Sequence, residues 1–422
     1  MRRYESYKDS GVEWLGDVPS HWELGRISTY FTERRTKVSD KDYPALSVTK
    51  LGVFPQWENV AKTNDGDNRK LARKGDFVIN SRSDRKGSSG IAKQDGSVSL
   101  INIVLQPKKI NSVYSEYLFK SYNFIEEFYR VGHGIVADLW TTRFEDIKNS
   151  LIIYPPLSEQ QKIAQFLDDK TAKIDQAVDL AEKQIALLKE HKQILIQNAV
   201  TRGLNPDVPL KDSGVEWIGQ VPEHWDVKKL KYLGNAIIGL TYSPDDLCDE
   251  SEGILVARSS NIQNGSFVYS DNVYVKKQIP KKLQLKEQDI LICSRNGSRD
   301  LIGKCAYITK DQEKHTFGAF TTVFRSKYNP YLFYILNSEI FKRLSGNFLT
   351  STINQLTINN LNSIQVALPP LLEQQKIADY LDKQTAKIDQ AIALKTAHIE
   401  KLKEYKSVLI NDVVTGKVRV SV

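Results

Sequence analysis

The sequence of 422 residues contains only three cysteines and one methionine, and it has no long apolar run. Cys248, Cys293 and Cys305 are far apart, with no Cys-x-x-Cys pair and no histidines nearby. This spacing argues against a zinc site or a disulfide framework and indicates a reducing compartment, the cytoplasm. No stretch approaches the roughly 18 consecutive apolar residues of a membrane-spanning helix. The N-terminus has charges without an apolar segment behind them, so we expect neither a secretory signal nor a membrane partner.

The sequence also lacks a strong excess of either charge. Its 59 Lys and Arg against 51 Asp and Glu give a net charge of +8, and residues 1–157 contain 24 basic and 20 acidic residues. A basic chain can bind nucleic acid, but many proteins of equal charge do not. Composition therefore permits a polyanionic partner without identifying one.

Two sequence blocks occur twice, in the same order. Residues 8–22 and 211–225 are identical at 12 of 15 positions, and residues 155–177 and 369–391 at 18 of 23 positions. The stretches between these blocks show no comparable identity. A period of about 200 residues is too long for a solenoid, whose units have roughly 20–50 residues. Drift after a simple duplication would have changed blocks and intervening stretches alike. We therefore interpret the pattern as one scaffold that presents two different recognition surfaces.

Each second block begins a long predicted helix, over residues 158–203 and 371–417. Ser158 follows two prolines and suits the N-cap, and Gly203 stands at the expected end of the first helix. Apolar residues recur in alternating steps of three and four, the period of a coiled-coil seam. At 1.5 Å per residue, a helix of about 45 residues is roughly 65 Å long. The seam positions that we single out are Leu167, Ile174, Ile185, Leu188, Leu381, Ile388, Ile399 and Leu402.

One such helix alone would leave its apolar stripe in water, so we expect the two helices to pack together, antiparallel. Lys192 and Lys406 interrupt the stripe at equivalent positions. Polar seam residues often fix the register of a coiled coil. Alternatively, both lysines lie at the edge of the seam with their ammonium groups in water. The sequence favours neither explanation over the other.

The stretches between the blocks predict compact modules of about 140 residues that contain both strands and helices. Residues 97–105 and 289–293 are β-rich runs, while residues 115–131 and 330–344 have helical spacing. The predicted fold class is α+β. It consists of two globular modules separated by two long antiparallel coiled-coil helices, with a pseudo-twofold internal repeat.

Two turns rich in Ser, Gly and Arg stand at equivalent places in the modules, each just after a predicted strand. Residues 67–93 hold eight basic residues against three aspartates, and residues 294–299 read Ser-Arg-Asn-Gly-Ser-Arg. Arg can bind guanine bidentately, Asn suits adenine, and Ser suits phosphates or base edges. A solvated hairpin tip would explain either turn alone, but two equivalent turns make DNA contact an equally good explanation. The candidate DNA-binding residues are Arg82, Ser83, Arg85, Lys86 and Ser88 in the first turn, and Arg295, Asn296, Ser298 and Arg299 in the second.

The repeated blocks resemble the specificity subunit of type I restriction–modification systems over the whole chain. They are GVEWLGDVPSHW with GVEWIGQVPEHW, and PPLSEQQKIAQFLDDKTAKID with PPLLEQQKIADYLDKQTAKID. The resemblance implies that two target-recognition domains each recognise one half of a split sequence in double-stranded DNA. It implies that the antiparallel helices set the length of the spacer between the half-sites. It further implies a non-catalytic subunit that holds two methyltransferase (modification) subunits and, in the full complex, restriction/translocase subunits.

The two turns match this family unequally. The turn at Arg295 looks like the Ser-Arg-x-Gly turn common in these domains, whereas Asp84 takes the place of the glycine in the turn at Arg82. Which bases are recognised does not follow from the resemblance. The implied divisions are residues 1–157 and 204–370 for the two repeat blocks with their recognition domains, and residues 158–203 and 371–422 for the spacer helices, the latter with a tail.

No motif predicts a catalytic residue, a cofactor or a metal site. Gly297 to Lys304 resembles a phosphate-binding loop, but five residues separate its glycines where four are required, and Cys305 replaces the Ser or Thr. His21 and His224 follow the prolines of the repeated Pro-x-His-Trp turn, where packing explains them better than catalysis. We therefore predict a DNA-recognising adaptor whose chemistry is performed by partner subunits. The alternative is a scaffold that bridges two proteins and whose basicity is incidental.

Overall fold

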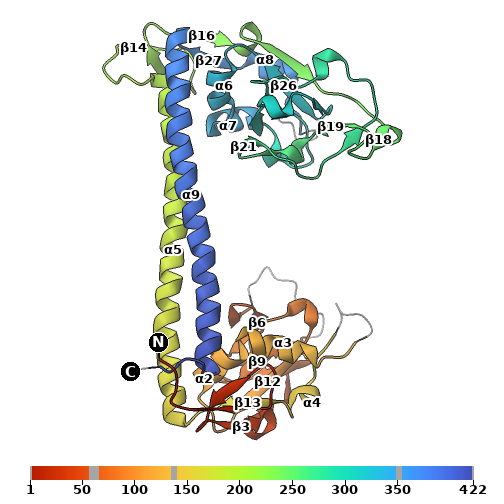
Figure 1. Cartoon of the computed structure of the whole chain (residues 1–422), viewed down its shortest axis with the longest axis vertical. Helices are drawn as coiled ribbons and strands as arrows, with labels where there is room; N and C mark the ends of the chain where they lie inside the picture. The colour runs from red at the N-terminus through yellow and green to blue at the C-terminus, as the bar shows by residue number, and fades with distance from the viewer. Residues whose placement is uncertain (1, 57–65, 135–139, 348–353, 421–422) are drawn as a thin grey trace. The chain divides into compact units, whose positions relative to one another are not determined.

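The chain folds as two compact units in a computed structural model (Figure 1). The first unit comprises residues 1–182 and 396–422, and the second comprises residues 183–395. Each unit contains strands, short helices and one part of each of the two long helices. None of the helices in the described part of the chain is long and apolar enough to cross a membrane. The described residues are 2–56, 66–134, 140–347 and 354–420.

The two long helices are α5 (Leu157–Arg202) and α9 (Leu371–Val414), which confirms the predicted ranges to within three residues. The start of α5 differs from the prediction. The Pro156 carbonyl accepts hydrogen bonds from the amides of Glu159 and Gln160, at 2.8 and 3.0 Å, so Ser158 lies inside the first turn and is not the N-cap. Gly203 follows the last residue of α5 with φ +74°, a left-handed conformation that glycine adopts without steric cost.

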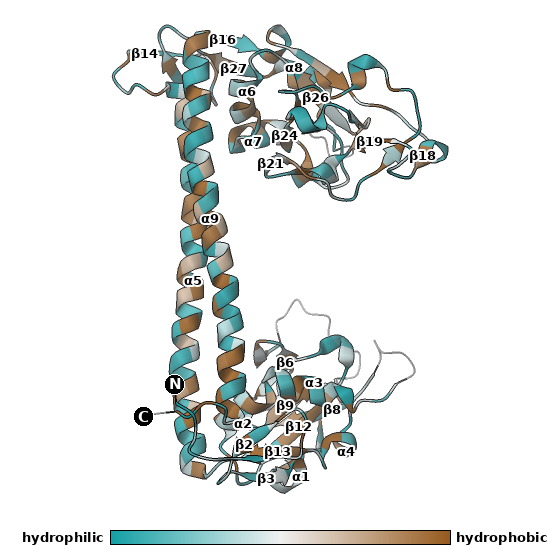
Figure 2. Cartoon of the chain, in the orientation of Figure 1, coloured by the Kyte–Doolittle hydropathy of each residue, from teal (hydrophilic) through white to brown (hydrophobic). Residues whose placement is uncertain are grey.

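Apolar residues recur along both helices between polar ones (Figure 2). All eight predicted seam residues are buried or half-buried, with Leu167 and Leu381 fully inaccessible to solvent. The predicted positions therefore lie on the less exposed side of each helix, and their role as a coiled-coil seam stays a prediction.

Parts of α5 and α9 contact each other within each unit. In the first unit, Lys406 Nζ lies 2.6 Å from Oδ1 of Asp175; in the second, Lys192 Nζ lies 2.7 Å from Asp389. Both lysines are half-buried at the edge of the contact, and both pair with an aspartate of the other helix. Each lysine therefore has a specific partner on the other helix, and a role in fixing the register stays a prediction.

The core of the first unit lies between a sheet of order β10-β9-β12-β4 and helices α2 and α3. All neighbours in this sheet are antiparallel, and β9 contributes Phe77 and Ile79 to the core. A second sheet has the order β11-β8-β5. The strands are β1 (Tyr7–Asp9), β2 (Asp17–Pro19), β3 (Glu23–Arg26), β4 (Phe31–Glu33), β5 (Lys37–Val38), β6 (Leu46–Thr49), β7 (Gly52–Pro55), β8 (Arg69–Ala72), β9 (Phe77–Asn80), β10 (Ser89–Ile91), β11 (Gly96–Val98), β12 (Asn102–Pro107) and β13 (Leu151–Tyr154). The short helices are α1 (Ile27–Tyr30), α2 (Ser112–Phe119), α3 (Tyr122–Arg130) and α4 (Phe144–Ile147).

The second unit repeats this core order within a larger sheet, β17-β26-β23-β24-β21-β20. Its first four strands correspond to β4, β12, β9 and β10 of the first unit, and all of their pairings are again antiparallel. The strands are β14 (Leu210–Asp212), β15 (Gln220–Pro222), β16 (Asp226–Lys229), β17 (Asn235–Ile238), β18 (Leu247–Cys248), β19 (Ile254–Ala257), β20 (Ile262–Gln263), β21 (Gly265–Phe267), β22 (Tyr274–Val275), β23 (Ile290–Cys293), β24 (Cys305–Tyr307), β25 (Thr316–Phe317), β26 (Thr321–Arg325) and β27 (Gln365–Leu368). The short helices are α6 (Asn329–Leu336), α7 (Glu339–Asn347) and α8 (Ile358–Ser363).

Three of the predicted segments within the modules are each two elements instead of one. The run 97–105 contains the end of β11 and the start of β12, separated by a turn at residues 99–101. The helical stretch 115–131 breaks between α2 and α3, because the Ser121 side chain caps α3 by accepting a hydrogen bond from the Phe124 amide. The stretch 330–344 breaks in the same way between α6 and α7, where Ser338 Oγ accepts from the Phe341 amide. In both cases a serine side chain caps the start of a second helix inside a continuous apolar pattern.

A buried tyrosine anchors the end of a long helix in each unit. Tyr114 Oη donates to the Val414 carbonyl at the end of α9, at 3.2 Å, and Tyr331 Oη donates to the Val200 carbonyl near the end of α5, at 3.1 Å. Both tyrosines are buried on the short helix that follows the central sheet strand. The end of each long helix is therefore part of the core of its unit.

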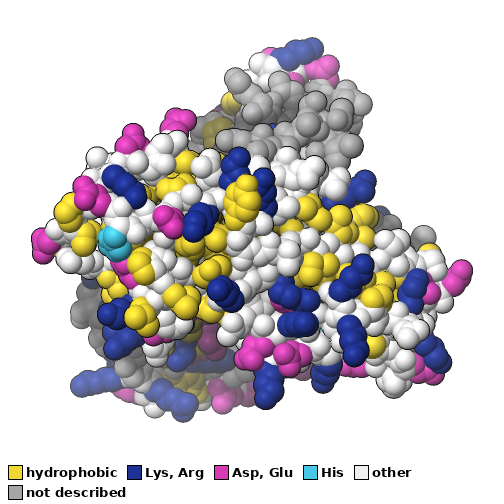
Figure 3. All heavy atoms as spheres, turned by 90° about the horizontal axis from the view of Figure 1, so that it is seen from above, with side chains coloured by type: hydrophobic (Ala, Val, Ile, Leu, Met, Phe, Trp, Pro, Cys, Tyr) yellow, Lys and Arg dark blue, Asp and Glu magenta, His cyan; other side chains and the backbone are white. Residues whose placement is uncertain are grey.

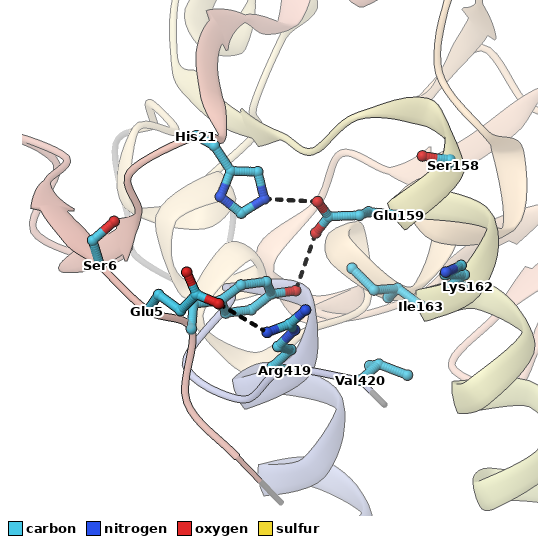
Figure 4. A pocket seen from close by; sticks show the side chains of 10 residues that line it. Glu5, Ser6, His21, Ser158, Glu159, Lys162, Ile163, Arg419 and Val420 are labelled. Carbon is cyan, nitrogen blue, oxygen red and sulfur yellow. Dashed lines mark hydrogen bonds and ion pairs between the residues drawn. The ribbon is translucent and has the colours of Figure 1, made fainter. Parts of the chain in front are cut away.

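A glutamate in the first turn of each long helix anchors the first repeat block. Glu159 pairs with His21 Nε2 at 2.6 Å (Figure 4). It also accepts hydrogen bonds from Trp22 Nε1 and the Tyr4 hydroxyl, at 2.9 and 3.2 Å. In the second unit Glu373 pairs with His224 Nε2 at 2.8 Å. The histidines thus connect the turn to the helix, a contact that the sequence pattern did not reveal.

Candidate nucleic-acid interface

Both predicted turns connect corresponding strands of the two units. The first turn joins β9 to β10, and the second joins β23 to β24. Each turn also pairs with a second segment that is distant in sequence. Arg82 bridges to Thr141, and Arg295 bridges to Gln355. The two turns therefore occupy equivalent places in the two units, each paired with a segment about 60 residues further along the chain.

Backbone hydrogen bonds fix this second segment at the base of each turn. The Thr142 amide donates to the Ser81 carbonyl at 3.0 Å, and the Leu356 amide donates to the Ser294 carbonyl at 2.8 Å. Ser81 and Ser294 are themselves buried, so the base of each turn is rigidly placed while the residues after it face outward. Each candidate interface therefore includes both the turn and the segment paired with it.

The second turn exposes its arginine over an aromatic ring. The Arg295 guanidinium lies 5.3 Å from the ring centroid of Phe320, which is itself 61% exposed. No carboxylate pairs with Arg295 among the residues that the structure describes. An exposed aromatic ring beside an unpaired guanidinium is an arrangement that can stack on or bind a base edge.

The remaining residues of the second turn are held by hydrogen bonds. Asn296 Nδ2 donates to Ser259 Oγ at 3.0 Å, and Asn296 Oδ1 accepts from the Ser298 amide at 2.9 Å. Arg299 Nη2 donates to the Gly346 carbonyl at 3.0 Å. Asn296 therefore uses its amide to shape the turn, while the side chains of Ser298 and Arg299 remain exposed.

The first turn is different in its details. Lys86 Nζ lies 2.6 Å from Glu126, and Arg85 lies 3.7 Å from the neighbouring Asp84, so both charges are partly neutralised. Ser83 begins a 3-10 turn and is half-buried. Ser88 is only 5% exposed, so its hydroxyl could meet a ligand only after the turn had moved. Arg82 is exposed and is the counterpart of Arg295.

The basic cluster at residues 67–93 is weaker than its composition indicates. Arg69 is buried and donates to Ser97, while Arg73 and Lys70 pair with Asp95 and Glu33. Basic side chains are likewise spread among acidic and apolar ones over the face of the molecule in Figure 3. Fewer of these basic side chains are therefore free to attract a polyanion than the composition indicates.

Sequence reasoning missed the second segment of each site. Trp140 and Thr141 in the first unit, and Gln355 with Phe320 in the second, lie beside the turns through pairings between residues far apart in the chain. No local motif marks them. Only the strand order, which brings these segments together, could have indicated their positions.

The side chains at these turns are hydrogen-bond donors and acceptors. Among the described residues, no group of three or more His, Cys, Asp or Glu side chains could hold a metal ion. Cys293 lies directly beneath the second turn, and burial raises the pKa of its thiol to about 11, so it stays protonated and adds no charge. Arg, Asn and Ser side chains remain as donors and acceptors for base edges and phosphates.

Comparisons with protein families and with curated proteins find similarity to the same kind of protein in both halves of the chain. The family described as the type I restriction modification DNA specificity domain matches residues 20–189 and 222–404. The MjaVIII specificity subunit of a type I restriction enzyme from Methanocaldococcus jannaschii is 27% identical, over 96% of this chain and 94% of that protein. The EcoKI specificity subunit from Escherichia coli K12 is 28% identical over 47% of this chain and 44% of that protein.

Two solved structures share the fold. One, from work on complex assembly and conformational transition of the type I R-M system, superposes with a TM-score of 0.74 at 14% identity, over 95% of this chain and 99% of that chain. The HsdS subunit from Thermoanaerobacter tengcongensis gives a TM-score of 0.55 at 16% identity, over 95% and 98%.

Proposed function

The chain belongs to the family of type I restriction modification DNA specificity domains, and we propose that it is the DNA-recognition subunit of a type I restriction–modification complex. In this proposal the modules within residues 1–157 and 204–370 each recognise one half of a bipartite target in double-stranded DNA. The observation that supports it best is the recurrence of an exposed arginine turn after the same strand of both units. Both units place a turn after the same strand but carry different side chains there. Such an arrangement is suited to recognising two different DNA half-sites in the same way.

The long helices are proposed to form an antiparallel coiled coil that sets the spacer between the half-sites. Facing pairs support this direction, because Asp175, Gln184 and Lys192 of α5 contact Lys406, Lys395 and Asp389 of α9. Along these pairs the residue number on α9 decreases as the residue number on α5 increases, as expected for antiparallel helices. Residues 158–203 and 371–422 would then act as the spacer helices and the tail.

The repeated frame suits two copies of one partner. Leu157 and Leu371 begin the two long helices at equivalent positions, and both are exposed. Exposed leucines at equivalent positions can contact two copies of the same partner. We propose that two modification subunits bind there and perform the methylation, with restriction subunits added in the full complex. The chain itself is proposed to be a non-catalytic cytoplasmic subunit, and the bridging-scaffold alternative is not favoured by the names of its relatives.

A gel-shift titration tests DNA recognition. The chain would be titrated, alone and with its cognate modification subunits, against a random-sequence duplex and genomic fragments at several salt concentrations. We expect binding that weakens steeply with salt, because phosphate contacts release counterions. Arg295→Ala should weaken cognate binding by about 1–3 kcal/mol if Arg295 contacts a base edge.

The control variant is Lys310→Ala, an exposed lysine outside the turn. Absence of DNA binding in both preparations would refute the proposal and favour the bridging scaffold.

A further inference from the structure

A pocket of about 440 Å³ lies behind the second recognition turn. It is lined by residues from three segments: the 3-10 turn Ser259–Asn261 and the hairpin that follows it, the 3-10 turn Arg299–Leu301, and Lys304 just before β24. The lining residues are Ser259, Ser260, Ile262, Gln263, Asn264, Leu301 and Lys304. All of them belong to the second unit.

The pocket and the turn are joined by a direct hydrogen bond. Asn296 of the turn donates to Ser259 Oγ of the pocket at 3.0 Å. Leu301 closes the 3-10 turn that begins at Arg299, so the same stretch of chain forms the end of the recognition turn and one wall of the pocket. A ligand bound at the turn therefore lies next to the pocket.

Lys304 differs from the other half-buried cations of this unit. Lys192, Arg258 and Arg325 pair with aspartates, and Lys395 donates to Gln184. For Lys304 no ion pair or side-chain hydrogen bond is found within the described ranges of the chain. Because Lys304 lines the pocket without an anionic partner, a ligand that supplies a negative charge there would gain a charge-assisted hydrogen bond.

The pocket also offers hydroxyl groups. Ser260 lines the pocket, and its Oγ is shielded from solvent without a hydrogen-bond partner in the described structure. Rotation about χ1 would let this hydroxyl donate to a ligand oxygen. At the mouth, Asn264 has φ +49° and Gly265 has φ +83°, the two left-handed residues of a tight hairpin turn between β20 and β21. This turn holds the exposed Gln263 and Asn264 side chains beside the pocket.

We propose that this pocket binds a backbone phosphate of the DNA, with Lys304 and Ser260 as its ligands, while the turn at Arg295 contacts the bases. The inference rests on the proposed function. An ammonium group and a hydroxyl suit a phosphate oxygen, and such contacts position a protein on DNA without reading its sequence. The phosphate-loop resemblance at Gly297 to Lys304 fails as a nucleotide motif, yet its lysine serves the same type of anion here.

The test compares salt dependence on two duplexes. Wild type and Lys304→Ala would each be prepared in complex with the modification subunits. Each complex would be titrated against a fluorescent random-sequence duplex and against a cognate duplex, which carries the sequence that the complex methylates. Losing one phosphate contact should make the slope of log K against log salt less negative by about 0.9. Binding should weaken by the same factor on both duplexes. Ser260→Ala should weaken both in the same way, by less, because it removes a neutral donor.

Lys310→Ala is the matched control, since Lys310 is an exposed lysine beyond the other end of β24 and outside the pocket. Lys304→Gln, which removes the charge but keeps most of the length of the side chain, provides a second variant if Lys304→Ala lowers the unfolding midpoint. An unchanged slope, or a loss confined to the cognate duplex, would overturn the phosphate assignment. Failure of the wild-type complex to bind either duplex would instead refute the proposed function itself.

Discussion

The first and second units hold their frames with matching contacts and differ at the turns that face outward. Tyr114 and Tyr331 donate to the ends of the long helices, and Glu159 and Glu373 pair with equivalent histidines. At the turns, by contrast, the residues that precede the next strand differ. In the first unit the residue just before β10 is Ser88, which is buried. In the second unit the residue just before β24 is the half-buried Lys304.

This difference separates two kinds of constraint. The frame residues satisfy buried donors and acceptors, so a change at any of them costs stability. Most turn residues, such as Arg82 and Arg295, are exposed, so they can differ between the units without unfolding them. A protein that must recognise two sequences with one architecture needs this separation.

The largest effect is expected from removing the buried tryptophans of the frame. Trp22→Ala and Trp225→Ala should each destabilise their unit by about 3–5 kcal/mol, because both side chains are completely buried. Urea unfolding followed by circular dichroism measures the change. Trp140→Ala, at a partly exposed tryptophan beside the first turn, is the control and should cost less than about 0.5 kcal/mol. An equal loss of unfolding free energy in all three variants would contradict the distinction between frame residues and turn residues.

An insertion tests whether the helices act as a ruler between the units. One heptad added after Lys183 in α5 and one after Ala397 in α9 keeps the seam in phase and lengthens both helices by about 10 Å. DNA rises 3.4 Å per base pair, so the spacer between half-sites should lengthen by about three base pairs. Methylome sequencing of a strain with the variant measures the spacer. A heptad added to α5 alone shifts the helices out of register and should lower stability. An unchanged spacer in an active paired variant would contradict the ruler.

A smaller effect distinguishes the two tryptophans themselves. Trp22 Nε1 donates to Glu159, whereas no partner of the buried Trp225 Nε1 is found in the described part of the chain. Trp22→Phe should therefore cost about 1 kcal/mol more than Trp225→Phe, since only the first change breaks a hydrogen bond to a carboxylate. Chemical denaturation of both variants gives the difference. An equal loss in both would mean that this hydrogen bond adds nothing.

The sequence predicted the repeating parts of the fold better than the parts that differ. The period of three and four located α5 and α9, and repeated blocks placed the two turns after equivalent strands. It failed at Ser121 and Ser338, because a single capping serine breaks a helix without disturbing the apolar pattern.

For a related reason, the sequence indicated the turns of the candidate site but not the segments that pair with them. Arg82 and Arg295 are conspicuous by composition, but Thr141 and Gln355 reach them through pairings across about 60 residues. Ser88 was chosen from its neighbours in the sequence, although burial removes it from the surface. Exposure and long-range pairing depend on the whole fold and leave no local signal.

Exchange of one module tests the central claim, that each unit recognises its own half of the target. Residues 30–150 would be replaced by the corresponding insert of a relative with a different target, leaving the repeat blocks and both helices unchanged. Methylome sequencing of cells that carry the chimera and its partner subunits would then give the modified sequence. The account predicts that one half-site changes while the other half-site and the spacer are retained. A chimera that is active but changes both half-sites, or neither, would contradict it.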